Sequence, residues 1–276
     1  MRKVATIFLL LLIACPSFAA SKISWFRTLD AALEYSANHS KPIFVDAYAD
    51  WCLWCHKLDR EVYADPKFIK FMNDFVPLKM DVEDQSEGSR FAERYQVTGL
   101  PTLLVLDSTG YVVDRISGYS NAATLIEGIK SMQQSLEAER KNPGNLEVTF
   151  RLAEEYMFRE MNEEAEIRYS KILQSTKSPA VHKQSAQFSI GLSQYYQGKL
   201  SRASASLEAY ISSYPQGESL EDAYLLLSQI HLEDGNEARA RFYLQEFLRK
   251  FPKSRNVIRA EQVLLKLEEE TGGSLN

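Results

Sequence analysis

The sequence DAYADWCLWCH occupies residues 46–56 and carries the most informative pattern in the chain. It follows an apolar run at 43–45, which is rich in strand-forming residues, and precedes a stretch with helical character. Cys52 therefore falls at the expected N-terminus of a helix, where unpaired backbone N–H groups and the helix dipole favour a thiolate. Cys55 lies about one turn further along, close enough to pair with Cys52. A disulfide that closes so small a loop restricts the unfolded chain very little, so we expect its purpose to be chemical.

The acidic residue Asp46 precedes Cys52 by six positions and stands among apolar residues. A carboxylate buried behind the dithiol would accept the proton of Cys55 when that thiol attacks a mixed disulfide. Deprotonation matters because the thiolate, not the thiol, is the nucleophile. The plainer alternative is a solvated aspartate at the end of a strand.

Helical and strand-like patterns alternate over residues 24–137. Apolar residues at four-residue steps mark a first amphipathic helix that begins at Trp25 and ends before Lys41. Further helices are expected after the cysteines, at 66–73, around 91–95 and from Asn121 to about 137. Strands are expected at 43–48, 75–82, 102–106 and 112–116, the last two joined by a hairpin turn. We therefore expect an α/β fold with a mixed sheet and helices on both of its faces.

Several motifs in this part of the chain match the pattern of a known family: KPIFVD at 41–46, WC with a second Cys at 51–55, DP at 65–66 and VTGLPT at 97–102. From Trp25 to about Ser135 the sequence resembles a thioredoxin-fold domain. The resemblance is to the branch that contains the C-terminal periplasmic domain of DsbD and related small exported proteins. It implies the activity of a protein thiol-disulfide oxidoreductase.

The resemblance also implies a role for each matching residue. It implies that Cys52 is the attacking thiol and Cys55 the resolving thiol. It implies that Asp46 is the buried acid and that Lys79 is its partner. The expected redox group is the Cys52–Cys55 disulfide itself, without a bound cofactor.

Four residues are candidates for contact with the substrate chain. The resemblance implies that Pro101 is cis and packs beside the disulfide, presenting the backbone of Leu100 to an extended substrate. Trp51 and Trp54 are next to the cysteines and would shape a platform for the substrate. The alternative for both tryptophans is packing at the start of the helix.

The residues around the cysteines depart from the usual thioredoxin pattern. Leu-Trp at 53–54 replaces Gly-Pro, and His56 replaces the common Lys. The resemblance therefore does not fix the redox potential of the cysteine pair. Cys-x-x-Cys-His is also the attachment signature of c-type haem. The preceding strand, the acid at position 46 and the Gly-x-Pro-Thr sequence at 99–102 favour the redox interpretation. Zinc is disfavoured, because the other histidines lie in separate helical contexts without ligand spacing.

The first 19 residues have the pattern of a signal peptide. Basic residues at 2–3 precede an apolar run at 4–13, and a small-residue cleavage site ends at Ala19. We therefore expect an exported protein, in the periplasm. The sequence LIAC at 12–15 also resembles a lipobox, which would leave Cys15 lipidated and anchor the protein to a membrane.

The pattern changes after the sequence KNPGN at 141–145, and the chain begins to repeat itself about every 37 residues. The corresponding positions are Gly198 and Gly235 in turns, Ala165, Ala203 and Ala240 in second helices, Ala153, Gly191 and Ser228 in first helices, and Pro215 and Pro252 at the ends. Residues 143–252 resemble tetratricopeptide (TPR) repeats, followed by a capping helix at 254–270 whose polar residues face water. The first repeat lacks the turn Gly and the closing Pro.

We thus expect a signal peptide at 1–19, a thioredoxin-like domain at 20–140 and TPR-like helical repeats with a capping helix at 141–276. With 32 Lys and Arg against 37 Asp and Glu, the formal charge of −5 excludes a surface that coats nucleic acid. No phosphate loop or dinucleotide fingerprint occurs.

The preferred hypothesis is an exported oxidoreductase that reduces disulfides in a client protein and is itself reduced by an electron-donor redox protein. The repeats would bind a partner or the client in their groove, which raises its concentration near the dithiol. The alternative is a TPR-type adaptor in which the thioredoxin-like domain is secondary or regulatory.

Overall fold

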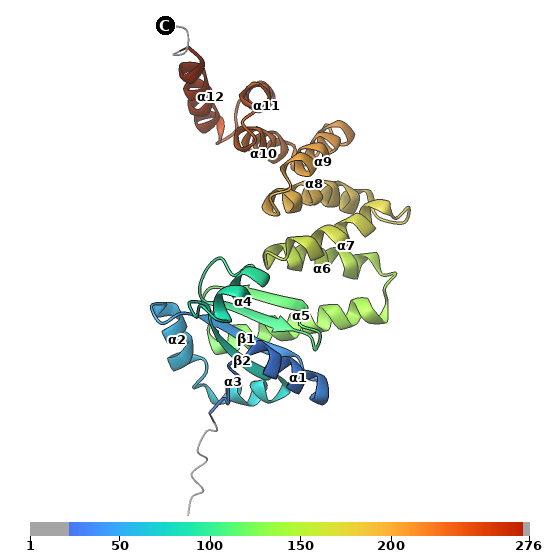
Figure 1. Cartoon of the computed structure of the whole chain (residues 1–276). Coiled ribbons are helices and arrows are strands. Elements are labelled where there is room, and N and C mark those ends of the chain that lie inside the picture. Colours follow the sequence, from blue (N-terminus) through green and yellow to red (C-terminus); the bar gives the residue numbers. More distant parts are fainter. Residues whose placement is uncertain (1–21, 273–276) are drawn as a thin grey trace, which may run out of the picture. The chain divides into compact units, whose positions relative to one another are not determined.

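The structure of the protein, a computed structural model, describes residues 22–272 (Figure 1). These residues form two compact units. The first contains the described residues up to Pro101 with Leu106–Tyr111 and Gly118–Ile126, and the second contains Thr102–Val105, Val112–Ser117 and the chain from Glu127 onward. The predicted signal peptide and Cys15 lie outside the described residues.

A mixed four-stranded sheet has the strand order β2-β1-β3-β4. The strands are β1 (Ile43–Tyr48), β2 (Val76–Asp81), β3 (Thr102–Leu106) and β4 (Val112–Ser117). β1 and β2 run parallel, with Ile43 opposite Val76 and Tyr48 opposite Asp81. β3 is buried along its whole length and β1 along all but its last residue, which explains why both strands are mostly apolar, with Asp46 as the charged exception in β1.

Helices connect these strands in the predicted order: α1 (Leu29–His39), α2 (Leu53–Glu61), α3 (Pro66–Phe71), a short 3-10 helix η1 (Met72–Asp74), α4 (Gly88–Arg94) and α5 (Ala122–Lys141). Local chemistry explains where α3 begins. The Asp65 side chain accepts hydrogen bonds from the backbone N–H groups of Lys67 and Phe68, and Pro66 occupies the first turn. The arrangement confirms the predicted α/β thioredoxin fold.

The first helix begins later than its sequence pattern indicated, at Leu29 rather than Trp25. Phe26 instead forms a parallel bridge with Leu78 of β2. Its carbonyl oxygen accepts a hydrogen bond from the Lys79 N–H at 3.0 Å. Because these backbone groups bond to β2, they are not available to a helix, and the apolar side chain of Trp25 serves the core from an extended segment.

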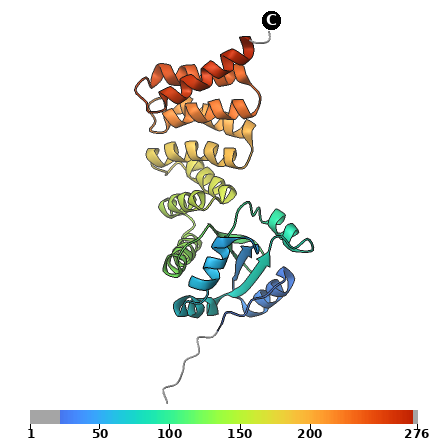
Figure 2. The same cartoon turned by 90° about the vertical axis from the view of Figure 1, so that its left-hand side faces the viewer.

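Antiparallel helices follow, as Figures 1 and 2 show. They are α6 (Leu146–Phe158), α7 (Asn162–Gln174), α8 (Ala180–Tyr196), α9 (Leu200–Ser213), α10 (Leu220–Glu233), α11 (Glu237–Lys250) and α12 (Val257–Gly272). Each of these helices packs against the one that follows it in the chain. This confirms the TPR-like helical region.

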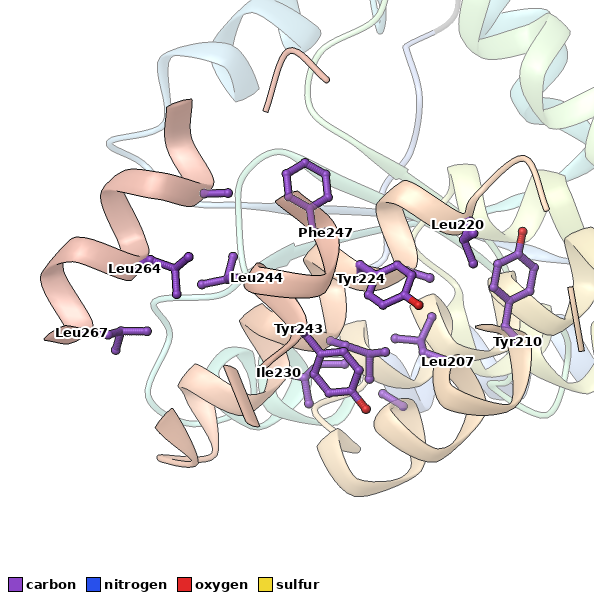
Figure 3. Packing of buried hydrophobic residues seen from close by; sticks show 14 residues of the cluster. Leu207, Tyr210, Leu220, Tyr224, Ile230, Tyr243, Leu244, Phe247, Leu264 and Leu267 are labelled. Atoms are coloured by element: carbon purple, nitrogen blue, oxygen red, sulfur yellow. The ribbon is translucent and has the colours of Figure 1, made fainter. Parts of the chain in front are cut away.

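A continuous apolar cluster joins the last four helices (Figure 3). Its labelled members are Leu207 and Tyr210 of α9, Leu220, Tyr224 and Ile230 of α10, Tyr243, Leu244 and Phe247 of α11, and Leu264 and Leu267 of α12. A glycine in α8 permits this helix to approach α9, the first helix of the cluster. A Cβ atom on Gly191 would lie 2.7 Å from the Leu207 Cγ, so α8 and α9 could not pack as they do with a larger residue there.

The turns between paired helices use the left-handed backbone region. Gly198 and Gly235 have φ angles of 70° and 72°, as their positions in the repeat predicted. The first repeat, which lacks the turn glycine, places Glu160 at the same point with φ of 59°. The backbone conformation is therefore repeated even where the residue type is not.

The capping helix is α12, which buries Ala260, Leu264 and Leu267. Polar residues such as Glu261 and Lys266 face water as predicted, and Ile258 and Leu265 are exposed as well. Among the helices of residues 22–272, none is both long enough and apolar enough to cross a membrane.

Candidate active site

The two cysteines form a disulfide at the N-terminus of α2, with Cα atoms 5.3 Å apart. Cys52 is the N-cap residue, and its Sγ accepts a hydrogen bond from the backbone N–H of Cys55 at 3.1 Å. Both side chains are buried. A thiolate at Cys52 would receive this N–H and the positive end of the helix dipole, which lowers the pKa of a thiol.

The acid that precedes the motif is fully buried, as its apolar neighbours indicated. Asp46 lies in β1 opposite Lys79 of β2, and the Lys79 Nζ lies 3.2 Å from the Asp46 Oδ2. Within the described chain, neither carboxylate oxygen has a hydrogen bond of adequate geometry. Burial raises the pKa of Asp46 to about 6, although the charge of Lys79 opposes this change.

Lys79 also forms an ion pair with Asp59 of α2, whose side chain is 43% exposed. Its ammonium group lies 4.9 Å from the ring centre of Tyr48 and 5.3 Å from that of Tyr63. The pKa of Tyr63 is well above its usual value because the hydroxyl is buried near the charges of Asp46 and Asp59. One cation thus links a fully buried carboxylate to a carboxylate that reaches solvent.

The loop before β3 contains the predicted cis proline. The Leu100–Pro101 peptide bond is cis, which confirms the expectation, and Pro101 is buried. The Pro101 carbonyl oxygen accepts a hydrogen bond from the Gly118 N–H at 2.8 Å, just after β4. Leu100 is half-buried. Pro101 is therefore fixed by two connections, to β3 along the chain and to the segment after β4 through Gly118.

The tryptophans next to the cysteines are on the surface. The exposed fractions are 67% for Trp51, 79% for Leu53 and 55% for Trp54. The Trp51 indole N–H donates to Glu83 at 3.3 Å. Both tryptophans thus leave more than half of their surface exposed, although Trp54 also contacts Tyr119.

Sequence reasoning missed two residues of this site. Asp59 follows Cys55 by four positions and so lies one helical turn along α2, a spacing that could have identified it. Tyr119, which contacts Trp54 from the segment after β4, gives no local signal because 65 residues separate the two.

Two features bear on the competing haem and zinc interpretations. The His56 Nε2 lies 2.8 Å from the backbone oxygen of Asp50, next to the motif. Within residues 22–272, no three side chains of His, Cys, Asp or Glu converge in a way that could hold a metal ion.

Comparisons with known proteins divide along the chain. A family model described as a thioredoxin-like domain matches residues 29–133, and one described as an outer membrane lipoprotein (YfiO) matches residues 181–262. The thiol:disulfide interchange protein DsbD of Vibrio vulnificus (strain CMCP6) is 32% identical over 112 residues, which cover 40% of this chain and 19% of that protein. The chain thus spans about a fifth of the length of the curated DsbD proteins that it matches.

Two solved structures are similar to part of this chain. A putative disulphide-isomerase from Bacteroides thetaiotaomicron is 34% identical, with 41% of this chain and 95% of that chain covered and a TM-score of 0.38. The oxidised C-terminal domain of Neisseria meningitidis DsbD is 23% identical, with 39% and 98% covered and a TM-score of 0.34. Residues 29–133 are a thioredoxin-like domain by the family model, and the sequence match relates this chain to part of DsbD; a TPR-like helical region follows in the same chain.

Proposed function

We propose that this protein is an exported thiol-disulfide oxidoreductase that reduces disulfides in client proteins. The observation that carries the proposal is the Cys52–Cys55 disulfide at the start of α2, where a backbone N–H already points at the Cys52 Sγ. The relationship of residues 29–133 to DsbD supports the same chemistry. The direction of electron flow is part of the proposal.

The reaction consists of two exchanges. In the reduced enzyme, the Cys52 thiolate attacks one sulfur of the client disulfide, forms a mixed disulfide and releases the first client thiolate, which takes a proton from solvent. Cys55 then loses its proton and attacks the Cys52 sulfur, which releases the second client thiol. Two electrons pass to the client, and the enzyme is left with the Cys52–Cys55 disulfide.

Asp46 is the proposed acceptor for the proton of Cys55, directly or through water. With a pKa of about 6, its carboxyl group is mostly ionised at neutral pH and is therefore able to take up a proton. Lys79 and Asp59 extend from Asp46 toward solvent. They would pass the proton from Asp46 back to solvent.

Regeneration of the dithiol needs an electron-donor redox protein, which we propose as the second partner. The outer membrane lipoprotein model and the DsbD relationship both support a location in the cell envelope. We propose the periplasm after cleavage near residue 19, with anchoring through Cys15 as the alternative. We also propose a domain boundary near residue 140, where α5 ends.

The TPR-like region is proposed to bind the client or another protein. Its surface exposes large apolar side chains, among them Phe158 at 89% and Tyr196 at 62%, which would be available for contact with a partner. The second candidate function, an adaptor in which this region carries the activity, rests on the same observation. A Cys52→Ala, Cys55→Ala double variant that retains the complete cellular phenotype would favour the adaptor.

Covalent trapping tests the proposed function. Cys55→Ser is expected to accumulate mixed disulfides between Cys52 and its clients, which non-reducing electrophoresis and mass spectrometry would identify. Cys52→Ser is the matched control and should trap nothing through position 52. In the reduced wild-type protein, iodoacetamide should modify Cys52 faster at pH 6 than it modifies an ordinary free thiol. An ordinary alkylation rate at this pH would contradict the proposed thiolate.

A further inference from the structure

Trp54 is held in one orientation beside the disulfide by a residue from a distant part of the chain. The Tyr119 ring lies 5.6 Å from the Trp54 ring, centre to centre, at an interplanar angle of 35°. Tyr119 lies just after β4, whereas Trp54 belongs to the first turn of α2. Trp54 keeps 55% of its surface exposed, so this contact supports one part of the side chain and leaves the rest open.

Two charged residues of α2 complete the support. The Lys57 ammonium group lies 5.2 Å from the Trp54 ring centre and 4.5 Å from that of Tyr119. Glu61 accepts a hydrogen bond from the Tyr119 hydroxyl at 2.6 Å and lies 3.9 Å from the Lys57 Nζ. The hydrogen bond to Glu61 also raises the pKa of Tyr119. We call Trp54, Tyr119, Lys57 and Glu61 the Trp54 platform.

The charges of the platform are satisfied within it. Lys57 is next to Glu61 and faces both rings, so its ammonium group already occupies the electron-rich aromatic surface. A second cation placed there would meet the like charge of Lys57. An apolar side chain meets no such repulsion and would bury the open surface of Trp54, which is continuous along the chain with exposed Leu53.

We infer that the Trp54 platform is a specificity site that receives an apolar side chain flanking the reactive cysteine of the client. Tyr119 and Lys57 are positioning residues, because they act through Trp54 and not on the reacting sulfurs. The inference rests on the proposed oxidoreductase function and adds a substrate class to it. It favours clients with Leu-type residues next to the cysteine and disfavours clients with Lys at the same place.

Peptide disulfides in a single-turnover assay test this inference without an electron donor. The probes are symmetric disulfide dimers of acetyl-Xaa-Cys-Xaa-amide in which Xaa is Leu, Gly or Lys. One pre-reduced full-length protein molecule converts one dimer into two peptide thiols and is itself oxidised to the Cys52–Cys55 disulfide. Cys15→Ser is present in every sample so that only these two cysteines react. The readout is the second-order rate constant for each peptide, divided by that for the Gly peptide.

The wild-type protein is expected to prefer the Leu peptide over the Gly peptide by about three- to tenfold, and to reduce the Lys peptide more slowly than the Gly peptide. Tyr119→Ala should reduce the Leu preference to less than about twofold, while the rate constant for the Gly peptide stays close to the wild-type value. Tyr119→Phe retains the ring and should retain most of the preference. Lys57→Gln should raise the relative rate of the Lys peptide, because the repelling charge is gone.

Tyr111→Ala removes an exposed tyrosine elsewhere in the same fold and is expected to leave every ratio unchanged. Trp54→Ala should lose the Leu preference as Tyr119→Ala does, and it provides a second variant if Tyr119→Ala folds poorly. A Leu preference that survives in both variants would overturn the inference, as would its absence from the wild-type protein while the Gly peptide is still reduced. Failure of wild-type protein to reduce any of the three dimers would overturn the proposed function instead.

Discussion

The two compact units each bury an ion pair, and the pairs are built differently. In the first unit, Asp46 meets Lys79 at 3.2 Å, and Lys79 is shared with the partly exposed Asp59. In the second unit, Asp114 of β4 meets Arg159, at the end of α6, at 2.6 Å. Burial raises the pKa of both aspartates, to about 6 for Asp46 and to about 7 for Asp114.

The difference lies in what else the cation binds. Lys79 leads toward solvent through Asp59, which suits a group that exchanges protons. Arg159 donates to the Gly128 carbonyl oxygen at 2.9 Å and to Glu155 at 3.2 Å, so it joins α5, α6 and β4. We propose that the pair in the first unit serves proton transfer, whereas the pair in the second unit attaches elements of secondary structure to one another. The following substitutions test that contrast.

Arg159→Met is expected to have the largest effect, a loss of about 3–5 kcal/mol in the free energy of unfolding at pH 8, because it leaves the Asp114 charge buried without a partner. The folded-state pKa of Asp114 already exceeds its unfolded value, so proton binding favours the folded state as pH falls. Part of the loss should therefore be recovered at pH 5. Urea unfolding at both pH values measures this.

Arg140→Met, which breaks an exposed pair with Glu137 on α5, serves as the control and should cause no measurable loss. Equal losses for Arg140→Met and Arg159→Met would show that burial of the pair is not what matters. Reduction of the Gly peptide disulfide by Arg159→Met protein at a temperature where it is folded should match the wild type.

Asp46→Asn should slow the attack of Cys55 on a preformed mixed disulfide by about ten- to a hundredfold at pH 7, because the proton acceptor is lost. In the wild type this rate should fall as pH drops through about 6, and the variant should lack that inflection. Stopped-flow release of the client thiol measures both effects.

The stability of Asp46→Asn should move in the opposite direction to its activity. Since the folded-state pKa of Asp46 is raised above the unfolded value of 3.8, its ionisation destabilises the fold as pH rises from about 4 to 6. The variant should thus be at least as stable as wild type at pH 7. A large loss of stability with unchanged kinetics would show that Asp46, like Asp114, has a structural role and not a role in proton transfer.

Gly191→Ala is expected to destabilise the protein by about 1–3 kcal/mol, because the added Cβ would overlap the buried Leu207 side chain between α8 and α9. Gly128→Ala in α5 is the matched control. Its Cβ would have an ordinary 3.8 Å contact with Arg159, and alanine should add up to about 1 kcal/mol through helix propensity. Thermal unfolding of both variants would show whether close packing supports the repeats. Similar midpoints would contradict the packing argument.

The smallest effect is expected for Glu160→Gly, a gain of less than about 1 kcal/mol. Glycine adopts the left-handed backbone conformation of this turn without the strain that a Cβ atom causes. It also adds conformational freedom to the unfolded chain and removes the 3.1 Å hydrogen bond that Ser117 donates to Glu160. The converse substitution Gly198→Ala should lose about 1 kcal/mol at the equivalent turn. Chemical denaturation is the measurement, and destabilisation by Glu160→Gly would show that the side chain contributes more than the backbone costs.

Most of the elements were predictable because their signals are local. The buried strands appear as continuous apolar runs, and the repeat spacing locates the turns at Gly198 and Gly235. The start of α1 was misplaced, because a four-residue periodicity cannot reveal that the Phe26 backbone bonds to β2 instead. The exposed Ile258 and Leu265 of α12 accompany the polar residues that were expected to face water.

The cysteine pair and the buried acid followed from spacing along one strand and one helix, since residues 46–56 hold all three and the backbone dictates their order. The cis peptide bond at Pro101 was expected only through family resemblance. The attachment of Arg159 to Asp114 and the contact of Tyr119 with Trp54 join residues 45 and 65 positions apart. Such contacts depend on where folding brings separate elements, and no periodicity or motif encodes that position. The cysteine pair is thus a property of local sequence, whereas its proposed proton route and its aromatic support are properties of the folded chain.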